Sequence, residues 1–262
     1  MTSTPQLDVT NRFVLDFARR YAVLHPGARI LDYGCGAGHL VAAGRAEGLD
    51  LSGADVFYSG SQTRADAARS GLLGTAIHEI AGTPTPFPDA SFHLILNNQV
   101  LEHVDDLDAT LREFHRLLAP GGLLLSLFPS RDVLREGHIG IPFAHWFPPG
   151  SAARLYYTWA LRRLGLGTWK QQSPTCRQWA VDKLRWIDTY TRYRTRREIF
   201  RAFTHYFQWD LTELDYIRYR LLARPGRRLL ARLVGLPLLS PLACAAFRKL
   251  AFLVIVARKE PR

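Results

Sequence analysis

The sequence predicts an α/β fold in which helices cover both faces of a mostly parallel, doubly wound sheet. Short apolar runs alternate with segments of helical periodicity through the first 130 residues, a rhythm typical of parallel sheets. Three glycines, Gly34, Gly36 and Gly38, lie where the first strand should give way to a helix. The chain has 262 residues, of which 47% are hydrophobic and 22% charged, so one catalytic-size domain with insertions is the simplest organisation.

The elements of the first half follow from their apolar spacing. Residues 9–24 carry apolar side chains at helical intervals, and Pro26 and Gly27 end that helix. The helix before Pro120 is ended in the same way by the proline and two following glycines. After the first helix we expect strands at 30–32, 49–56, 75–80, 92–96 and 123–128, and helices at 39–47, 62–70 and 107–118.

The alternation breaks twice in the second half. Residues 131–196 contain five tryptophans interspersed with Arg and Pro, and the pattern resumes with a helix at 197–206 and strands at 209–214 and 251–257. Ligands in open α/β sheets bind beyond the carboxyl ends of the strands. We therefore expect residues 1–130 to form the ligand-binding core, 131–196 to form a lid that faces the substrate, and 197–262 to complete the core, with a basic and apolar helical insertion at about 217–249.

Charge divides the chain into two unlike halves. Residues 1–130 have 9 Lys and Arg against 14 Asp and Glu, whereas residues 131–262 have 25 against 9. The basic half should attract an anionic partner, such as a phospholipid surface, a nucleic acid or a phosphorylated small molecule. Residues 233–247 form an uncharged run between basic clusters that resembles an interfacial membrane anchor, although a buried pair of helices is equally economical.

The same sequence predicts the cellular context. No run is long and apolar enough to span a bilayer, and the first 28 residues lack the core of a secretory signal. We expect a cytoplasmic protein, with the inner face of the membrane as the alternative location. Three cysteines without a CxxC pair indicate neither a disulfide framework nor a zinc cluster, and no close group of Asp, Glu and His with ligand spacing predicts a metal site.

The segment RILDYGCGAGHL, residues 29–40, predicts a ligand-binding turn. Glycine lets a ligand lie against the backbone and lets the turn adopt positive φ. A dinucleotide-binding GxGxxG turn would need glycine at position 39, where the chain has His39, so an NAD-dependent dehydrogenase is disfavoured. Asp32 followed by the three glycines instead resembles the first motif of the class I S-adenosylmethionine-dependent methyltransferases.

Further motifs carry that resemblance. Asp55 stands where the family places the carboxylate that accepts the ribose hydroxyls, and PFPDASFHLILNNQVLEHV and LREFHRLLAPGGLLLSL resemble segments of the ubiquinone/menaquinone-type ("type 11") methyltransferases. The resemblance implies a seven-stranded Rossmann-like sheet with S-adenosylmethionine as cofactor. The family usually has an acid at His93 and often one near Ala81, for which Glu79 is a candidate replacement. The implied cofactor-binding residues are Asp32, Tyr33, Gly34, Cys35, Gly36, Gly38, Asp55, Val56, Asn97 and Gln99.

Three histidines are candidate catalytic residues. His103 follows the fourth strand, although a structural histidine bonded to backbone is the alternative there. His138 and His145 lie in REGHIGIPFAHWFP, where either could act as a general base or merely cap backbone groups of a packed loop. The candidate substrate-binding residues are Trp146, as an aromatic wall, and Arg194 and Arg197, as anion ligands in the arginine-rich run at 190–209.

These observations predict methyl transfer to a small, lipid-linked or glycan-linked anionic acceptor, with oxygen as the methylated atom. An RNA or DNA methyltransferase is the alternative enzyme, but NNQV ends the fourth strand where base-amino methyltransferases carry an NPPY-type sequence, so we do not expect a nucleic-acid partner. A non-catalytic, cofactor-binding protein associated with a membrane is the third hypothesis.

Overall fold

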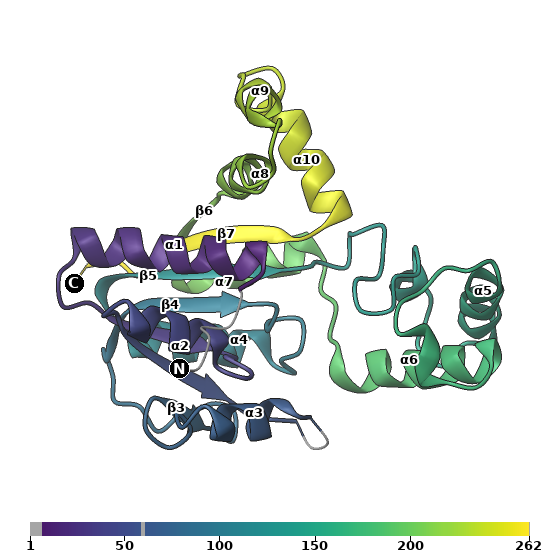
Figure 1. Cartoon of the computed structure of the whole chain (residues 1–262), viewed down its shortest axis with the longest axis horizontal. Coiled ribbons are helices and arrows are strands. Elements are labelled where there is room, and N and C mark those ends of the chain that lie inside the picture. The colour runs from purple at the N-terminus through teal and green to yellow at the C-terminus, as the bar shows by residue number, and fades with distance from the viewer. Residues whose placement is uncertain (1–6, 59–60, 262) are drawn as a thin grey trace.

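The computed structural model describes residues 7–58 and 61–261 and contains one seven-stranded sheet with strand order β3-β2-β1-β4-β5-β7-β6 (Figure 1). The pairs among β1 to β5 are parallel, whereas β7 runs antiparallel to both of its neighbours. This is the doubly wound α/β fold expected from the sequence. The strands are β1 (Arg29–Tyr33), β2 (Asp50–Asp55), β3 (Ile77–Glu79), β4 (Phe92–Asn98), β5 (Leu118–Phe128), β6 (Gln208–Leu211) and β7 (Leu253–Arg258).

Helices pack on both faces because the central strands are apolar on both sides. Leu94 and Leu96 of β4 belong to the core cluster that includes α1 and α2, while Ile95 between them belongs to the cluster that includes α4 and α7. This follows from the alternation of side chains along a strand. The helices are α1 (Val9–Leu24), α2 (His39–Ala46), α3 (Thr63–Arg69), α4 (Leu107–Leu117), α5 (Ala152–Arg163), α6 (Cys176–Tyr190), α7 (Arg196–Tyr206), α8 (Glu213–Leu222), α9 (Arg228–Leu233) and α10 (Ser240–Leu250).

The boundaries of α1 and α4 agree closely with the predicted ones, whereas β5 begins at Leu118, five residues before the strand predicted at 123–128, and contains Pro120. Asp8 caps α1 by accepting a hydrogen bond from the Asn11 backbone N–H at 2.8 Å, and Asp106 caps α4 in the same way. The strand predicted at 209–214 is wrong at its end, since β6 stops at Leu211 and α8 begins at Glu213. Glu213 is buried and pairs with Arg248 of α10, a contact that no local pattern indicates.

Residues 131–196, the lid, form a helical unit with its own small core. Trp179, Leu184 and Ile187 of α6 pack with Ile139 and Ile141, and Figure 1 shows α5 and α6 set to one side of the sheet. The chain enters and leaves the lid through adjacent segments, because the backbone N–H of Arg131 donates to the carbonyl oxygen of Arg194 at 2.7 Å. The lid also contacts the rest of the molecule beyond this junction, since the backbone N–H groups of Leu134 and Arg192 donate to the carbonyl oxygens of Lys249 and Glu102, each at 2.7 Å.

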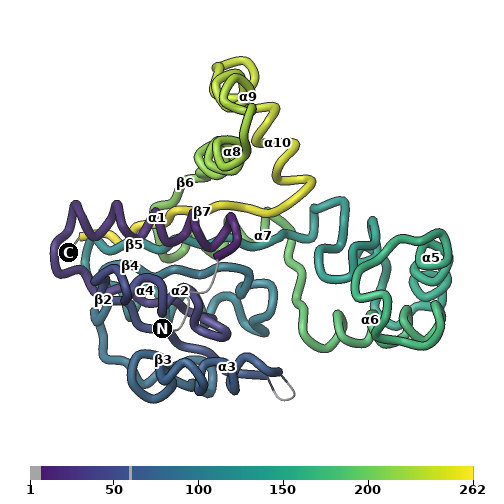
Figure 2. The backbone as a smooth tube through the Cα atoms, viewed as in Figure 1, coloured from purple at the N-terminus to yellow at the C-terminus, as the bar shows by residue number. Residues whose placement is uncertain are grey.

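Residues 213–250, the helical arm, project at the top of the view in Figure 2, whereas the lid extends to the right. Tyr216 of α8 and Phe247 of α10 anchor its base, with ring centroids 5.5 Å apart. The arm corresponds to the insertion expected at about 217–249. Within the described ranges, no helix has the length and apolar character needed to cross a membrane.

Candidate cofactor and acceptor site

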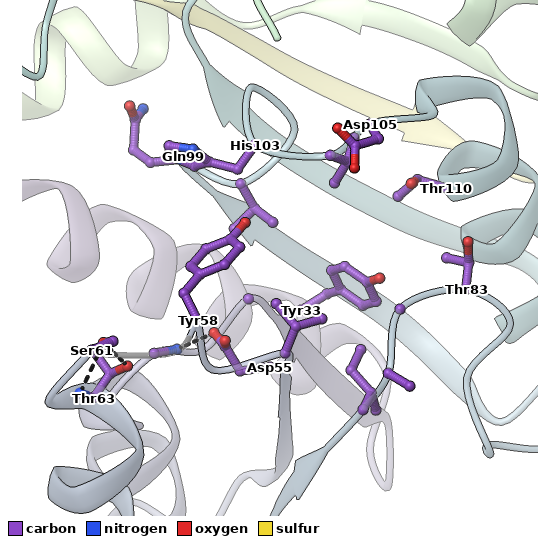
Figure 3. Close-up of a pocket in the computed structure, with 18 of the residues that line it drawn as sticks. Tyr33, Asp55, Tyr58, Ser61, Thr63, Thr83, Gln99, His103, Asp105 and Thr110 are labelled. Carbon is purple, nitrogen blue, oxygen red and sulfur yellow. Dashed lines mark hydrogen bonds between the residues drawn. The ribbon is translucent and has the colours of Figure 1, made fainter. Parts of the chain in front are cut away.

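A cavity of about 600 Å³ opens beyond the carboxyl ends of β1, β2 and β4 and reaches the lid. This is where a doubly wound sheet places its ligand. Figure 3 shows Asp55, Tyr58 and Tyr33 around this opening, with Gln99 and His103 across it. The cavity is lined by Tyr33, Gly34, Gly36, Asp55, Val56, Tyr58, Ser61, Thr63, Ile80, Ala81, Gly82, Thr83, Gln99, Val100, His103, Val104, Asp105, Asp106, Thr110 and Trp186.

The three glycines of the β1–α2 turn have different reasons for lacking a side chain. All have positive φ, but a Cβ on Gly34 would lie 2.2 Å from a Val100 methyl group, and one on Gly38 would lie 2.1 Å from Ile77. Those two glycines are required by packing within the protein. Gly36 has only Thr63 near its missing Cβ, at 3.9 Å, and it lines the cavity, so it is the glycine that leaves ligand space open.

Asp55 is held rigidly at the end of β2. Its Oδ2 accepts a hydrogen bond from the Gly36 backbone N–H and its Oδ1 accepts one from the Phe57 backbone N–H, each at 2.8 Å. Each carboxylate oxygen can accept further bonds, so this side chain can also receive two hydroxyl groups of a bound sugar. The position is the one that the sequence predicted for binding the ribose.

Asp32 lies beneath the glycine turn and is 5% exposed. Burial, and then the nearby charge of Asp55, raise the pKa of the Asp32 carboxyl to about 7. No described residue donates a hydrogen bond to this carboxyl group. A cationic ligand group would stabilise its ionised form, so the residue suits a bound ammonium.

The pH dependence of cofactor binding follows from Asp32. Below pH 7 the carboxyl group carries a proton, which must leave before the group can pair with an ammonium. The association constant for S-adenosylmethionine should therefore fall about tenfold for each pH unit between 6.5 and 5. Isothermal titration calorimetry across this pH range would measure the association constant. For Asp32→Asn we expect weak binding with an association constant that changes little with pH. A wild-type affinity that does not change with pH would contradict this role.

The remaining predicted cofactor residues divide into two groups. Tyr33, Val56 and Gln99 line the cavity, as do Gly34, Gly36 and Asp55. The lining does not include Asp32, Cys35, Gly38 and Asn97. The Nδ2 of buried Asn97 donates to the Tyr33 carbonyl oxygen at 3.2 Å, which supports the end of β1 from behind. Glu79, the expected replacement for an adenine-binding acid, pairs with Arg64 at 2.9 Å and does not line the cavity.

A cluster of titratable side chains lies where the lid meets the cavity. His103 lines the cavity, and its Nδ1–H donates to the Tyr190 carbonyl oxygen at 2.7 Å. The ring of His138, from the lid, lies with its centroid 5.2 Å from that of His103. The Nδ1–H of His138 donates to Oε1 of Glu136 at 2.7 Å. The structure thus brings together two of the three predicted catalytic histidines.

The two histidines have opposite pKa shifts. Burial lowers the pKa of His103 and outweighs its bond to the backbone, which favours a neutral ring. Burial would also lower the pKa of His138, but the hydrogen bond and charge of Glu136 outweigh it, so the pKa of His138 is raised. The same contact with His138, with help from Tyr193, lowers the pKa of buried Glu136. Glu136 therefore acts as a fixed anion that orients His138.

The other predicted catalytic and substrate residues lie elsewhere. His145 is 6% exposed and bonds through Nε2 to the Arg131 carbonyl oxygen at 3.0 Å, to which the Trp146 indole also donates. The guanidinium of Arg194 is engaged by backbone carbonyl oxygens, including that of Val104 at 2.8 Å, so it links the lid to the core. Arg197 is exposed on α7. None of these four lines the cavity.

Sequence reasoning missed several residues of the site. Tyr58 and Trp186 line the mouth of the cavity, and the ring of Tyr58 lies 5.4 Å from that of Tyr190. Trp186 and Tyr190 are four residues apart on α6, so they share a helix face, but that spacing alone does not show which face meets the cavity. Glu136 lies two residues before His138, and its role appears only in the folded loop.

Comparisons with known proteins agree with this geometry. A family model described as "Methyltransferase domain" matches residues 8–202. The ubiquinone biosynthesis O-methyltransferase of Chelativorans sp. (strain BNC1) is 35% identical over 132 residues, which are 48% of this chain and 51% of the relative. The malonyl-(acyl-carrier protein) O-methyltransferase of Yersinia pestis is 36% identical over 106 residues, which are 38% of this chain and 36% of the relative. The chain thus spans about half the length of the first of these curated relatives and just over a third of the second.

A crystal structure of an S-adenosylmethionine dependent methyltransferase from Mesorhizobium loti has the same fold, with a TM-score of 0.53 and 21% identity over 94% of this chain and 100% of that one. The family model covers nearly three quarters of the present chain. These matches confirm the fold, the family resemblance and the cofactor predicted from the sequence. The chain therefore belongs to the methyltransferase domain family, among the S-adenosylmethionine-dependent methyltransferases.

Proposed function

We propose that this protein transfers the methyl group of S-adenosylmethionine to an oxygen atom of a small or lipid-linked acceptor. The observation that carries this proposal is the cluster of His103, His138 and Glu102 at the lid side of the cofactor cavity. A hydroxyl acceptor must lose a proton on methylation, and this cluster offers groups that can accept that proton or promote its loss. Both relatives compared above are named O-methyltransferases.

The chain's own residues would align the reactants. S-adenosylmethionine, when bound, supplies a methyl group already activated for displacement by its sulfonium. Asp55 and Gly36 would hold the nucleoside end, and Asp32 would hold the ammonium. His103 would face the acceptor oxygen with His138 beside it, and the aromatic rings of Tyr58 and Trp186 would exclude water around it. Much of the rate would then come from alignment of the two reactants.

The residues that line the cavity change the class of acceptor that we expect. Its charged residues are Asp55, Asp105 and Asp106, and no Arg or Lys is among its described lining residues. Arg194 and Arg197, predicted to bind an anion, lie outside it. The lining therefore favours a neutral or weakly acidic hydroxyl at the methylated position, with any strongly anionic group of the acceptor outside the cavity.

An acceptor panel with radiolabelled S-adenosylmethionine tests the proposed reaction. Soluble phenols, prenylated phenols, acyl-carrier-protein-linked carboxylates and an RNA oligonucleotide would be compared, with label transfer and mass spectrometry as readouts. We expect O-methylation of a phenol of one of the first two classes. Methylation confined to the carboxylates or to the RNA, or to a nitrogen of any acceptor, would overturn the proposal.

We further propose that the tip of the helical arm contacts an anionic membrane surface. Residues 217–249 contain eight basic and no acidic residues, and the exposed arginines 227, 228 and 232 have no ion-pair partner in the described ranges. Amphipathic helices with this composition bind at the lipid interface. The leucines exposed at the tip are Leu229, Leu230, Leu233, Leu236, Leu238, Leu239 and Leu242.

Vesicle flotation tests whether the helical arm binds an anionic membrane surface. The protein should bind vesicles of phosphatidylglycerol and phosphatidylcholine in a salt-sensitive manner, and reversal of charge at Arg227 and Arg228 to Glu should weaken binding about tenfold or more. The double change of Arg197 and Arg201 to Glu on α7 alters net charge equally and should have a smaller effect. Equal losses in both double variants, or binding to neutral vesicles alone, would contradict the assignment.

A further inference from the structure

We propose that Glu102, His103 and His138 form a binding site for one divalent transition-metal ion, such as Zn²⁺, at the lid edge of the cofactor cavity. One ligand atom from each side chain lies within 4.8 Å of the other two. Glu102 and His103 come from the segment between β4 and α4, whereas His138 comes from the lid. The sequence does not indicate this cluster because 35 residues separate His103 from His138.

The Glu102 side chain is the observation that points to a ligand. It is 1% exposed, and neither of its carboxylate oxygens has a hydrogen-bond partner among the described residues. Buried carboxyl groups are nearly always paired, because an unpaired one loses its hydration without compensation. A cation between Glu102 and the two imidazoles would provide the missing partner.

The two histidines are oriented as metal ligands usually are. In each ring the Nδ1–H is already donated, to the Tyr190 carbonyl oxygen from His103 and to Glu136 from His138. This leaves the Nε2 lone pair of each ring free to coordinate. A histidine that bonds to a carboxylate or carbonyl oxygen through one nitrogen and to a metal through the other is the common arrangement in metalloproteins. Glu136 and Tyr193 further restrain the ring of His138.

The donor set indicates the class of ion. Two imidazole nitrogens and one carboxylate suit Zn²⁺, Fe²⁺ or Co²⁺, whereas Mg²⁺ and Ca²⁺ prefer oxygen ligands. Three protein ligands also leave a coordination position for water or substrate. Because His103 lines the cavity, an ion held by these side chains would lie at the edge of the space where the acceptor would bind.

The ion's role rests on the proposed function, although its binding does not. An acceptor hydroxyl that coordinates the ion would lose its proton to solvent more readily, because the cation stabilises the resulting oxyanion. The oxyanion would then form a bond to the methyl carbon, while the carbon–sulfur bond breaks and its electron pair returns to sulfur. The products are the methyl ether, S-adenosylhomocysteine and the released proton.

Metal titration of the purified full chain tests the site. Tag-free protein stripped with a chelator would be titrated with ZnCl₂ in a calorimeter and with CoCl₂ in an absorption spectrometer. We expect one Zn²⁺ per chain and at least about tenfold weaker binding after Glu102→Gln or His138→Ala. His205→Ala removes an exposed imidazole on α7 and is the matched control, for which unchanged binding is expected.

Two outcomes would overturn the site: no stoichiometric Zn²⁺ binding by the wild-type chain, or binding that neither variant weakens. The side chain of His138 is 24% exposed, so the fold should tolerate His138→Ala. This variant keeps the test valid if Glu102→Gln unfolds the protein. Thermal unfolding of both variants would check that they are folded. Zn²⁺ binding without methyl transfer would contradict the proposed function alone. Methyl transfer by a wild-type chain that binds no Zn²⁺ would overturn the site alone.

Discussion

His138→Ala is expected to lower kcat by about 100-fold or more while changing the Kd for S-adenosylmethionine by less than about twofold. Removal of a group that handles the acceptor's proton typically costs 10²- to 10⁴-fold in rate. His138 is not among the residues that line the cofactor cavity, so the cofactor should bind almost normally. The expectation holds whether the ring accepts the proton itself or holds a cation that promotes its loss.

Single-turnover kinetics and calorimetry on the same preparations would separate the two quantities. His205→Ala removes an imidazole far from the cavity and should leave both unchanged. Equal weakening of turnover and cofactor binding in His138→Ala would indicate that the ring only supports the lid.

Asp55→Ala should weaken the binding of S-adenosylmethionine by about 100-fold. The change removes the acceptors for two ribose hydroxyls, and hydrogen bonds to a charged group contribute about 1.5 to 3 kcal/mol each. It also leaves the N–H groups of Gly36 and Phe57 without their present acceptor, so the turn that lines the cavity would be less well ordered.

Calorimetric titration with S-adenosylmethionine and with S-adenosylhomocysteine measures this effect. Asp66→Ala is a suitable control, because Asp66 lies nearby on α3 but pairs with Arg69 and does not line the cavity. If Asp55→Ala bound both compounds as tightly as the wild type, the ribose assignment would be wrong.

The sequence was sufficient wherever a local signal determined the outcome. The bounds of α1 follow from its apolar spacing and from Pro26 and Gly27, which end it. The glycine turn was likewise located, but the reason for Gly34 and Gly38 was not, because their neighbours Val100 and Ile77 come from other strands and loops. Local sequence patterns predict the backbone conformation of the turn. They do not predict which distant side chain packs against each glycine.

Long-range contacts account for the misjudged site residues. Arg194 has the composition of an anion-binding residue, but its guanidinium bonds to carbonyl oxygens of Leu101 and Val104, about 90 residues earlier in the chain. Glu102 and His138 come together only because the lid folds back on the end of β4. A sequence position cannot reveal such a partner until the topology is known.

The closeness of the two ends of the lid has a consequence for how proteins with this fold can diversify. The backbone N–H of Arg131 is hydrogen-bonded to the carbonyl oxygen of Arg194 at 2.7 Å, so the two ends of the lid lie side by side. The residues between them can therefore be exchanged as one unit. A graft from another family member would replace His138 and Trp186 together and leave the glycine turn, Asp32 and Asp55 in place. New acceptor preferences could thus arise by module exchange, without rebuilding the nucleoside half of the protein.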